Sequence, residues 1–200
     1  MNRNTDELLI VFVRNAISGK VKTRLARTLG ADKALEIYRQ LLDHTHRITC
    51  HLPVDKAVFY SDFIEQNDLW NHQAYLKQQQ KGGDLGKRML QAFRWAFGIG
   101  YKKVVLIGSD TFQLRESHLT AAFDHLNRCD VVIGPAHDGG YYLIGMKQIY
   151  PALFKSKKWS SDTVLHATLE DLRSINGSYH LLEELVDIDT EEDLHLCGQL

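Results

Sequence analysis

The first residues that could do chemistry form a basic stretch behind an apolar run. Residues 8–13 (LLIVFV) are continuously apolar, and residues 14–27 then carry five Lys or Arg side chains and no acid. Gly19 lets the backbone turn there, and Lys22 and Arg24 supply positive charge for phosphate oxygens. Neither the G-x-x-x-x-G-K-[ST] nor the G-x-G-x-x-G spacing is present, which excludes the ATPase and dinucleotide motifs. The alternative interpretation is a solvated basic loop.

Two groups of carboxylates could hold a divalent cation. Ser109 and Asp110 follow the apolar segment 104–107, and Asp187 and Asp189 alternate near the C-terminus. Mg²⁺ typically takes one or two carboxylates together with phosphate oxygens and water, so Asp110 could bind Mg²⁺ or Mn²⁺ with open positions for a diphosphate. Helix capping or an Asx turn would also explain Ser109 and Asp110. The two alternating carboxylates near the C-terminus are easier to keep ionised beside a cation.

Two glycine-rich segments could approach a ligand closely. Residues 82–89 (GGDLGKRM) place a glycine-rich entry at the expected start of a helix, whose N-terminus can attract an anion. Residues 138–142 (DGGYY) are typical of a hairpin turn, but their glycines also admit a sugar or acceptor, and Tyr141 can stack on a ring. A capped helix and a simple turn are the structural alternatives.

The elements that must position these residues alternate along the chain. Strands are expected at 8–13, 57–60, 74–79, 104–107, 131–133, 141–145 and 185–188, and helices at 31–49, 63–70, 85–97, 116–126 and 163–173. A last helix should begin at Thr190, with Asp193 completing a capping arrangement. This order predicts an α/β fold in three layers (α/β/α), with an open, mostly parallel sheet and a late antiparallel addition. Ligands of such sheets bind beyond the carboxyl ends of the strands.

Composition restricts the class of protein. The 200 residues are 44% hydrophobic with a net charge of −1, which favours one globular domain over residues 1–200. No stretch approaches the ~20 apolar residues of a membrane-spanning helix. The polar residues 1–7 lack the features of a secretory signal, so a cytoplasmic location is expected. The balanced charge gives no net positive potential that would attract a nucleic acid, so no nucleic-acid partner is expected. The sequence leaves the oligomeric state open.

In this order, the segments resemble DUF2064, a bacterial group of small glycosyltransferase-A-like (GT-A-like) proteins described as arsenosugar-biosynthesis-type glycosyltransferases. The likeness covers nearly the whole chain. It depends on the strings GKVKTRLARTLG (19–30), GGDLGKRM (82–89), IGSD (107–110), DGGYYLIG (138–145), WSSDTV (159–164) and DIDTEEDL (187–194). Ser18 and Phe112 depart from the pattern, because the family usually has proline at both positions.

The resemblance implies the nucleotide-diphospho-sugar transferase fold and a role for each matching residue. Lys22 and Arg24 would face the phosphates, Asp110 would bind the metal that bridges the diphosphate, and Asp189 would be a second metal-proximal carboxylate. Asp138 and the glycines after it would look toward the donor sugar or acceptor. The candidate sets are Lys22, Asp110 and Asp138 for catalysis; Gly19, Lys22, Arg24, Gly83, Asp84 and Ser109 for the nucleotide and its phosphates; Gly139, Gly140, Tyr141 and Trp159 for the donor or acceptor; and Asp110 and Asp189 for the metal.

The expected function is metal-dependent transfer of a sugar from a nucleotide-activated donor to the hydroxyl group of a small-molecule acceptor. Mg²⁺ or Mn²⁺ on Asp110, with Lys22 and Arg24, would stabilise the departing diphosphate, and Asp138 would take the acceptor proton. A nucleotidyltransferase that releases pyrophosphate from a nucleoside triphosphate would use the same groups. A non-catalytic nucleotide-binding protein is the third hypothesis, kept open by Ser18 and Phe112.

Overall fold

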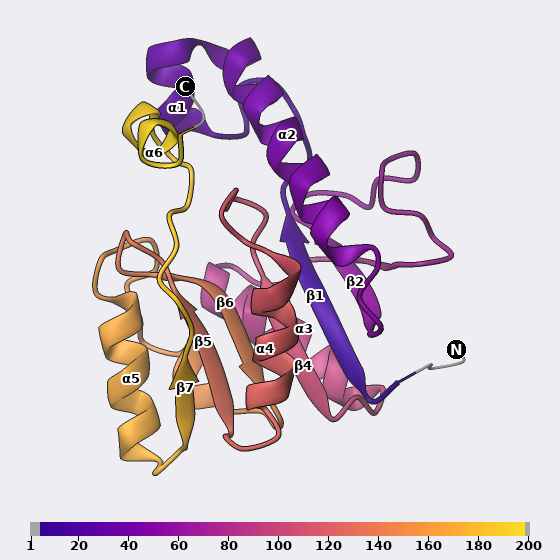
Figure 1. Ribbon diagram of the computed structural model, residues 1–200, viewed down its shortest axis with the longest axis vertical. Helices are drawn as coiled ribbons and strands as arrows, with labels where there is room; N and C mark the ends of the chain where they lie inside the picture. The colour runs from indigo at the N-terminus through magenta and orange to yellow at the C-terminus, as the bar shows by residue number, and fades with distance from the viewer. Residues whose placement is uncertain (1–4, 199–200) are drawn as a thin grey trace.

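Figure 1 shows the computed structural model of the chain, which describes residues 5–198. Its strands are β1 (Glu7–Val13), β2 (Asp55–Tyr60), β3 (Leu76–Gln79), β4 (Lys103–Ile107), β5 (Val131–Pro135), β6 (Tyr141–Met146) and β7 (Tyr179–Leu181). Its helices are α1 (Thr23–Leu29), α2 (Ala31–Thr49), α3 (Leu85–Gly98), α4 (Glu116–His125), α5 (Val164–Ser174), α6 (Glu191–Leu196) and the 3₁₀ helix η1 (Pro151–Phe154). No helix within residues 5–198 is both long and apolar enough to cross a membrane.

The seven strands form one mixed sheet in the order β3-β2-β1-β4-β6-β5-β7. Among the described strands β6 alone runs antiparallel to its neighbours, and it lies between β4 and β5. A short hairpin joins β5 to β6, so the reversed strand fills the interior of the sheet rather than its edge. The expected mostly parallel sheet with a late antiparallel addition is therefore confirmed.

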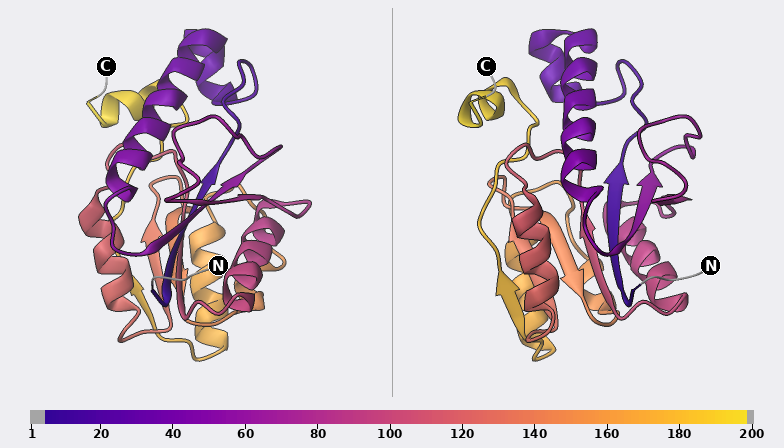
Figure 2. Two further views of the ribbon diagram at one scale, coloured as in Figure 1. Left: turned by 90° about the vertical axis from the view of Figure 1, so that its right-hand side faces the viewer. Right: turned by 45° about the vertical axis from the view of Figure 1, so that its right-hand side comes forward.

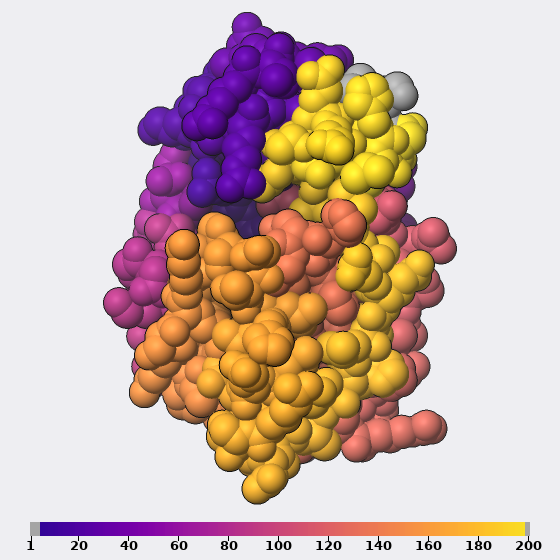
Figure 3. All heavy atoms as spheres, turned by 90° about the vertical axis from the view of Figure 1, so that its left-hand side faces the viewer, coloured from indigo at the N-terminus to yellow at the C-terminus, as the bar shows by residue number. Residues whose placement is uncertain are grey.

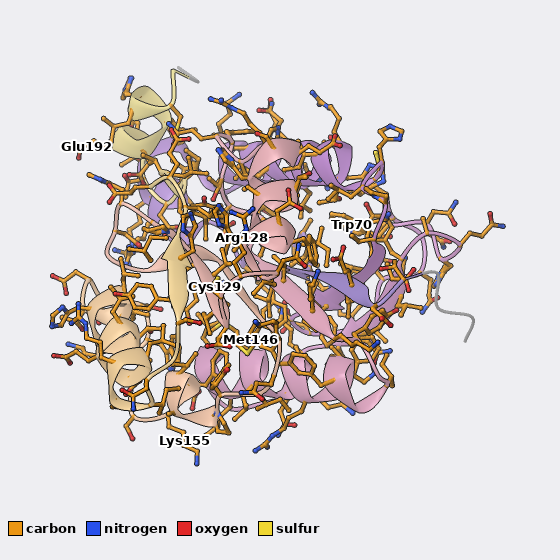
Figure 4. All side chains as sticks on the ribbon, turned by 60° about the horizontal axis from the view of Figure 1, so that its bottom comes forward. Trp70, Arg128, Cys129, Met146, Lys155 and Glu192 are labelled. Atoms are coloured by element: carbon orange, nitrogen blue, oxygen red, sulfur yellow. The ribbon has the colours of Figure 1, made fainter. Side chains whose placement is uncertain are left out.

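Helices cover both faces of this sheet, as the views in Figures 1 and 2 show. Alternate residues of β1 belong to opposite cores, because successive side chains of a strand point to opposite faces. Leu9 and Val11 pack with α1, α2 and α4, whereas Leu8 and Ile10 pack with α3 and η1. Figure 4 shows Met146 of β6 in the interior, where it is fully buried. The three-layer prediction is confirmed.

The helix predicted at residues 63–70 is wrong, because this segment is irregular. The buried Asn15 side chain accepts hydrogen bonds from the backbone N–H groups of Asp62 and Phe63 and donates to the Phe63 carbonyl. Lys77 donates to the Glu65 carbonyl at 2.8 Å. These distant side chains satisfy backbone groups that a helix would pair internally, so the segment needs no helical hydrogen bonds.

The strand predicted at residues 185–188 is also wrong. Leu185 makes an isolated parallel bridge with Ala136, and the edge strand is β7, which the sequence reasoning missed. Backbone hydrogen bonds to the β5 side of the sheet end at Leu185, whose N–H donates to the Pro135 carbonyl. The next backbone–backbone hydrogen bond of this segment runs from Ile188 N to the Asp110 carbonyl, so no strand forms at 185–188. The sequence reasoning also missed α1 and η1, which are short and lack a clear apolar period.

Candidate functional site

A cleft of about 610 Å³ opens at the carboxyl ends of β1 and β4. Its walls come from the start of α1, the loop after β4, the β5–β6 hairpin, the start of α3, residues 159–161 and residues 187–189. The space-filling view in Figure 3 is hollowed between the indigo N-terminal segment and the orange segment below it. Because the carboxyl ends of parallel strands meet at one edge of a sheet, loops far apart in the sequence converge here.

A buried ammonium group joins two carboxylates in this cleft. Lys22 Nζ lies 2.7 Å from Asp110 Oδ1 and 3.3 Å from Asp189 Oδ1. The Lys22 side chain is 5% exposed, whereas those of Asp110 and Asp189 are 44% and 47% exposed. Burial lowers the pKa of Lys22, but the charges of Asp110 and Asp189 outweigh burial, so the pKa lies above its ordinary value. Lys22 is therefore a charged group at neutral pH.

Lys22 holds this position with an uncommon backbone conformation. It precedes the first residue of α1 with φ 47° and ψ 48°, in the left-handed region that costs non-glycine residues about 1 kcal/mol or more. Ser18, which replaces the family's usual proline, donates its hydroxyl to Asp32 Oδ1 at 3.2 Å and so ties the first loop to α2. The second departure, Phe112, packs edge-on against His44 of α2.

The segment after β7 carries Asp189 to the cleft. Ile188 N donates to the Asp110 carbonyl at 2.8 Å, which fixes this segment beside the loop after β4. Thr190 and Asp193 form the predicted capping box at the start of α6, and Asp193 Oδ2 also accepts from Asp189 N at 2.9 Å. Arg24 Nη1 lies 3.7 Å from Asp189 Oδ2, so a second, exposed cation faces the same carboxylate.

Asp187 lies deeper than the other carboxylates of the cleft. Burial raises its pKa to about 7, although a hydrogen bond donated by the Thr111 hydroxyl opposes this rise. The neighbouring charges of Asp110 and Asp138 raise the pKa further. The sequence reasoning missed Thr111. Asp187 was indicated in the sequence only by its alternation with Asp189.

Tyr38 of α2 closes the floor of the cleft, and the sequence reasoning missed it. Its hydroxyl accepts from Arg14 N at 2.7 Å, donates to the Arg14 carbonyl at 3.1 Å and lies 3.5 Å from Ser109 Oγ. Burial raises the pKa of Tyr38, so the phenol is neutral. Tyr38 therefore holds together the loops after β1 and β4. Its sequence signal was that of an ordinary apolar position on a helix.

The other end of the cleft is aromatic. The Trp159 ring packs on α3 at Gly86, where a Cβ atom would come within 2.3 Å of the ring. Tyr141 also lines the cleft, and its hydroxyl contacts Met89 Sδ at 3.9 Å. Asp138 is exposed at the tip of the hairpin, where its Oδ1 accepts from Gly140 N at 2.9 Å. Asp84 caps α3 by accepting from Lys87 N at 2.8 Å.

The cleft brings together most of the predicted site residues. Those that line it are Lys22, Arg24, Asp84, Ser109, Asp110, Asp138, Gly140, Tyr141, Trp159 and Asp189. Gly19, Gly83 and Gly139 are not among the lining residues. Gly19 and Gly139 instead have positive φ angles in the turns that shape the walls, and a Cβ on Gly139 would lie 2.2 Å from the Asp162 carbonyl oxygen.

The oxygen donors suit a divalent cation that arrives with its ligand. Within residues 5–198 no cluster of three or more His, Cys, Asp or Glu side chains forms a ready cage for a metal. Asp110 and Asp189 nevertheless offer half-exposed carboxylates to one cleft. Mg²⁺ and Mn²⁺ accept such oxygens together with phosphate and water. The residues therefore fit a metal completed by a phosphate ligand.

The sheet order, the layers and the cleft define an α/β protein of the nucleotide-diphospho-sugar transferase fold. The chain belongs to the DUF2064 family, described as uncharacterized proteins conserved in bacteria, whose sequence profile matches residues 44–161. None of the curated proteins matches the sequence.

Solved structures share this fold. A candidate nucleotide-diphospho-sugar transferase from Desulfovibrio desulfuricans G20 is 33% identical, with a TM-score of 0.89 over 96% of this chain and 86% of that one. The 4-diphosphocytidyl-2C-methyl-D-erythritol synthase of Anaerococcus prevotii is 9% identical, with a TM-score of 0.58 over 96% and 94%. Rv0371c of Mycobacterium tuberculosis, in complex with manganese, is 11% identical, with a TM-score of 0.51 over 96% and 97%.

Proposed function

We propose that this protein transfers a sugar from a nucleotide-activated donor to a hydroxyl group of a small-molecule acceptor. The observation that carries this proposal is the convergence of Lys22, Arg24, Asp110 and Asp189 in one cleft at the carboxyl ends of β1 and β4. Two cations and two carboxylates suit a diphosphate with its metal. The description of the 33% identical relative as a candidate nucleotide-diphospho-sugar transferase supports the same substrate class.

Each residue of the cleft has a task in this reaction. Asp110 and Asp189 would hold Mg²⁺ or Mn²⁺, which supplies positive charge that stabilises the leaving diphosphate. Arg24, whose side chain is 61% exposed, binds the phosphates. The acceptor oxygen forms a bond to the anomeric carbon, the bond from that carbon to the phosphate oxygen breaks, and the diphosphate leaves with the electron pair. Asp138 takes the acceptor proton, and Tyr141 and Trp159 contact the sugar or the acceptor.

Nucleotidyl transfer is the second candidate, favoured by the number of cations in the first loop and α1. Arg14, Lys22 and Arg24 all line the cleft, and a triphosphate carries more negative charge than a diphosphate ester. In that reaction a substrate oxygen attacks the α-phosphorus, and pyrophosphate leaves. The synthase from Anaerococcus prevotii shares the fold, which alone does not fix the reaction.

Ligand-induced stabilisation followed by product analysis tests the proposal. The purified protein is melted with nucleoside triphosphates, diphosphates and nucleotide sugars, each with and without Mn²⁺, because a ligand that binds the native state raises Tm. We expect stabilisation by a nucleotide sugar and release of a nucleoside diphosphate when acceptors are added. Asp110→Asn should lower turnover by about 100-fold or more. Asp124→Asn makes the same chemical change on the exposed surface of α4 and should leave turnover unchanged.

Other outcomes would contradict the proposal in distinct ways. Undiminished turnover by Asp110→Asn would remove the metal role of this carboxylate. Stabilisation by a triphosphate alone, with release of pyrophosphate, would establish nucleotidyl transfer instead. Nucleotide binding with no product from any tested donor and acceptor would favour the non-catalytic hypothesis.

A further inference from the structure

The position of the Lys22 ammonium group raises a question about the proposed metal. Its Nζ contacts one oxygen of Asp110 and one of Asp189, at 2.7 and 3.3 Å. These are the two carboxylates that would hold the divalent cation. The Lys22 side chain is almost fully buried, so it does not extend into solvent as an ordinary lysine does.

Two cations cannot share this position at low cost. A divalent ion on the same two carboxylates would lie within a few ångströms of the ammonium group, and like charges that close repel strongly where solvent screening is weak. A phosphate that enters the cleft offers the ammonium group another anionic partner. The lysine side chain is long and flexible, with three donors on one nitrogen, so it can change partners without a change in the fold.

We propose that in the free protein the Lys22 ammonium group occupies the position of the divalent metal, between Asp110 and Asp189. When the metal binds, the ammonium group moves to the phosphates of the ligand. This inference rests on the proposed function. It assigns Lys22 as a positioning residue in the free protein, because its ammonium group contacts both carboxylates and holds them close together. It also makes binding of the metal and binding of the diphosphate mutually favourable. The metal frees the ammonium group for the phosphates, and the phosphates draw the ammonium group away from the carboxylates that bind the metal.

Binding of Mn²⁺ alone tests this inference without any turnover. Free Mn²⁺ is followed by its electron paramagnetic resonance signal while protein is added. Lys22→Met and Lys22→Gln should bind Mn²⁺ about tenfold or more tightly than the wild type, because the competing charge is gone. Lys20→Met removes the same charge from an exposed position in the same loop and should change the affinity by no more than about twofold. Circular dichroism confirms that each variant is folded.

The outcomes separate this inference from the proposed function. If the Lys22 variants bind Mn²⁺ no more tightly than the wild type, Lys22 does not compete for the cation position, although sugar transfer stands. If Lys20→Met strengthens binding as much as Lys22→Met, the effect is one of net charge, and the inference fails. If no variant binds Mn²⁺ alone, the inference fails, and turnover with and without added Mn²⁺ tests the metal role separately.

A second measurement uses the wild type and so avoids any folding defect. In protein labelled with ¹⁵N at lysine Nζ, a buried and paired ammonium group exchanges slowly enough for its signal to be observed. The Lys22 signal, identified by its loss in Lys22→Gln, should shift or disappear when Mg²⁺ and pyrophosphate are added together. The signal of Lys77, which is buried against Asp68 and is not a cleft-lining residue, should stay unchanged. An unchanged Lys22 signal with both ligands bound would overturn the inference.

Discussion

Tyr141 and Tyr142 are sequence neighbours whose hydroxyl groups have different surroundings. The Tyr142 hydroxyl donates to the Glu183 carbonyl at 3.0 Å, whereas the Tyr141 hydroxyl contacts the Met89 thioether, a weak acceptor, at 3.9 Å. Both rings line the cleft. The Tyr141 hydroxyl therefore has the weaker protein partner of the two.

At this scale we predict that Tyr141→Phe weakens substrate binding and leaves stability unchanged. KM for the donor or the acceptor should rise about three- to tenfold, the value of one hydrogen bond, and the free energy of unfolding should change by less than about 0.5 kcal/mol. Tyr142→Phe is the matched control, and it should cost about 1 kcal/mol of stability because the Glu183 carbonyl loses its donor. Steady-state kinetics and urea unfolding measure both. An unchanged KM in Tyr141→Phe would remove this tyrosine from the substrate contacts.

The start of α3 and the loop that carries Trp159 are two elements joined at one glycine. Gly86 lies in the first turn of α3, and its missing side chain leaves room for the Trp159 ring. The loop is also held by an ion pair between the buried Lys157 and Asp171 of α5. The aromatic end of the cleft thus depends on packing between segments about 70 residues apart.

We predict that Gly86→Ala displaces Trp159. The added methyl group would overlap the ring, which should cost about 1–3 kcal/mol of stability, shift the tryptophan fluorescence and reduce ligand-induced stabilisation. Gly98→Ala lies in the same helix with open space around it, and it should change stability by less than about 1 kcal/mol. Equal effects of the two substitutions would show that helix propensity, rather than contact with Trp159, sets the outcome.

The junction between β5 and β7 should give the protein an acid-sensitive contact. Asp130 Oδ2 accepts from Ser178 N at 3.0 Å and from Ser178 Oγ, and these hydrogen bonds hold the pKa of Asp130 below its ordinary value of 3.8. The folded state therefore favours the charged form. Its contribution to stability is complete above the unfolded-state pKa and is lost as pH falls through the folded-state pKa.

We therefore expect Asp130→Asn to unfold more easily than the wild type at pH 7, with the difference shrinking below about pH 4. Ser178→Ala should reproduce this pattern, because it removes a hydrogen bond from the same carboxylate. Urea unfolding at pH 7 and pH 3 measures the effect. A difference that stays constant over this range would show that the charge of Asp130 contributes nothing.

Across the whole molecule, the C-terminal segment links the far edge of the sheet to the N-terminal helices. Figures 1 and 3 show it rising from β7 to place α6 beside α1. Leu194 of α6 is 2% exposed within the core under α1 and α2. Because Asp189 lies just before α6, docking of this helix positions a carboxylate of the cleft.

At this scale Leu194→Ala should loosen both the fold and the site. The cavity should cost about 2–4 kcal/mol, and the protein should lose metal-dependent stabilisation by nucleotide as Asp189 becomes less ordered. Leu196→Ala on the same helix, where the side chain is 58% exposed, should change stability by less than about 0.5 kcal/mol. Differential scanning fluorimetry with and without ligand compares them. Full ligand response in a destabilised Leu194→Ala would separate α6 docking from the site.

Most of the strands, the layers and the cap of α6 could be predicted from the sequence because their causes are local. The apolar run 8–13 makes β1 a strand covered on both faces, and the last helix begins where Thr190 and Asp193 exchange hydrogen bonds three residues apart. Polar residues that directly follow the strands in the sequence indicated the cleft, because the carboxyl ends of parallel strands lie at the same edge of the sheet. The family strings then indicated most of the residues that line it.

Only the tertiary structure decided how those residues contact one another. Lys22 meets Asp189 across 167 positions of the chain, and local hydrogen-bonding and packing rules reach only about four. The same limit explains why the helix predicted at 63–70 does not form, since the distant Asn15 side chain makes hydrogen bonds with the backbone there. It also explains why Thr111 and Tyr38 were missed, because their hydrogen-bond partners lie on other elements. The sequence determined which charges reach the cleft. Folding decided which of them pair, because ionic and hydrogen-bonded contacts depend on separation in space.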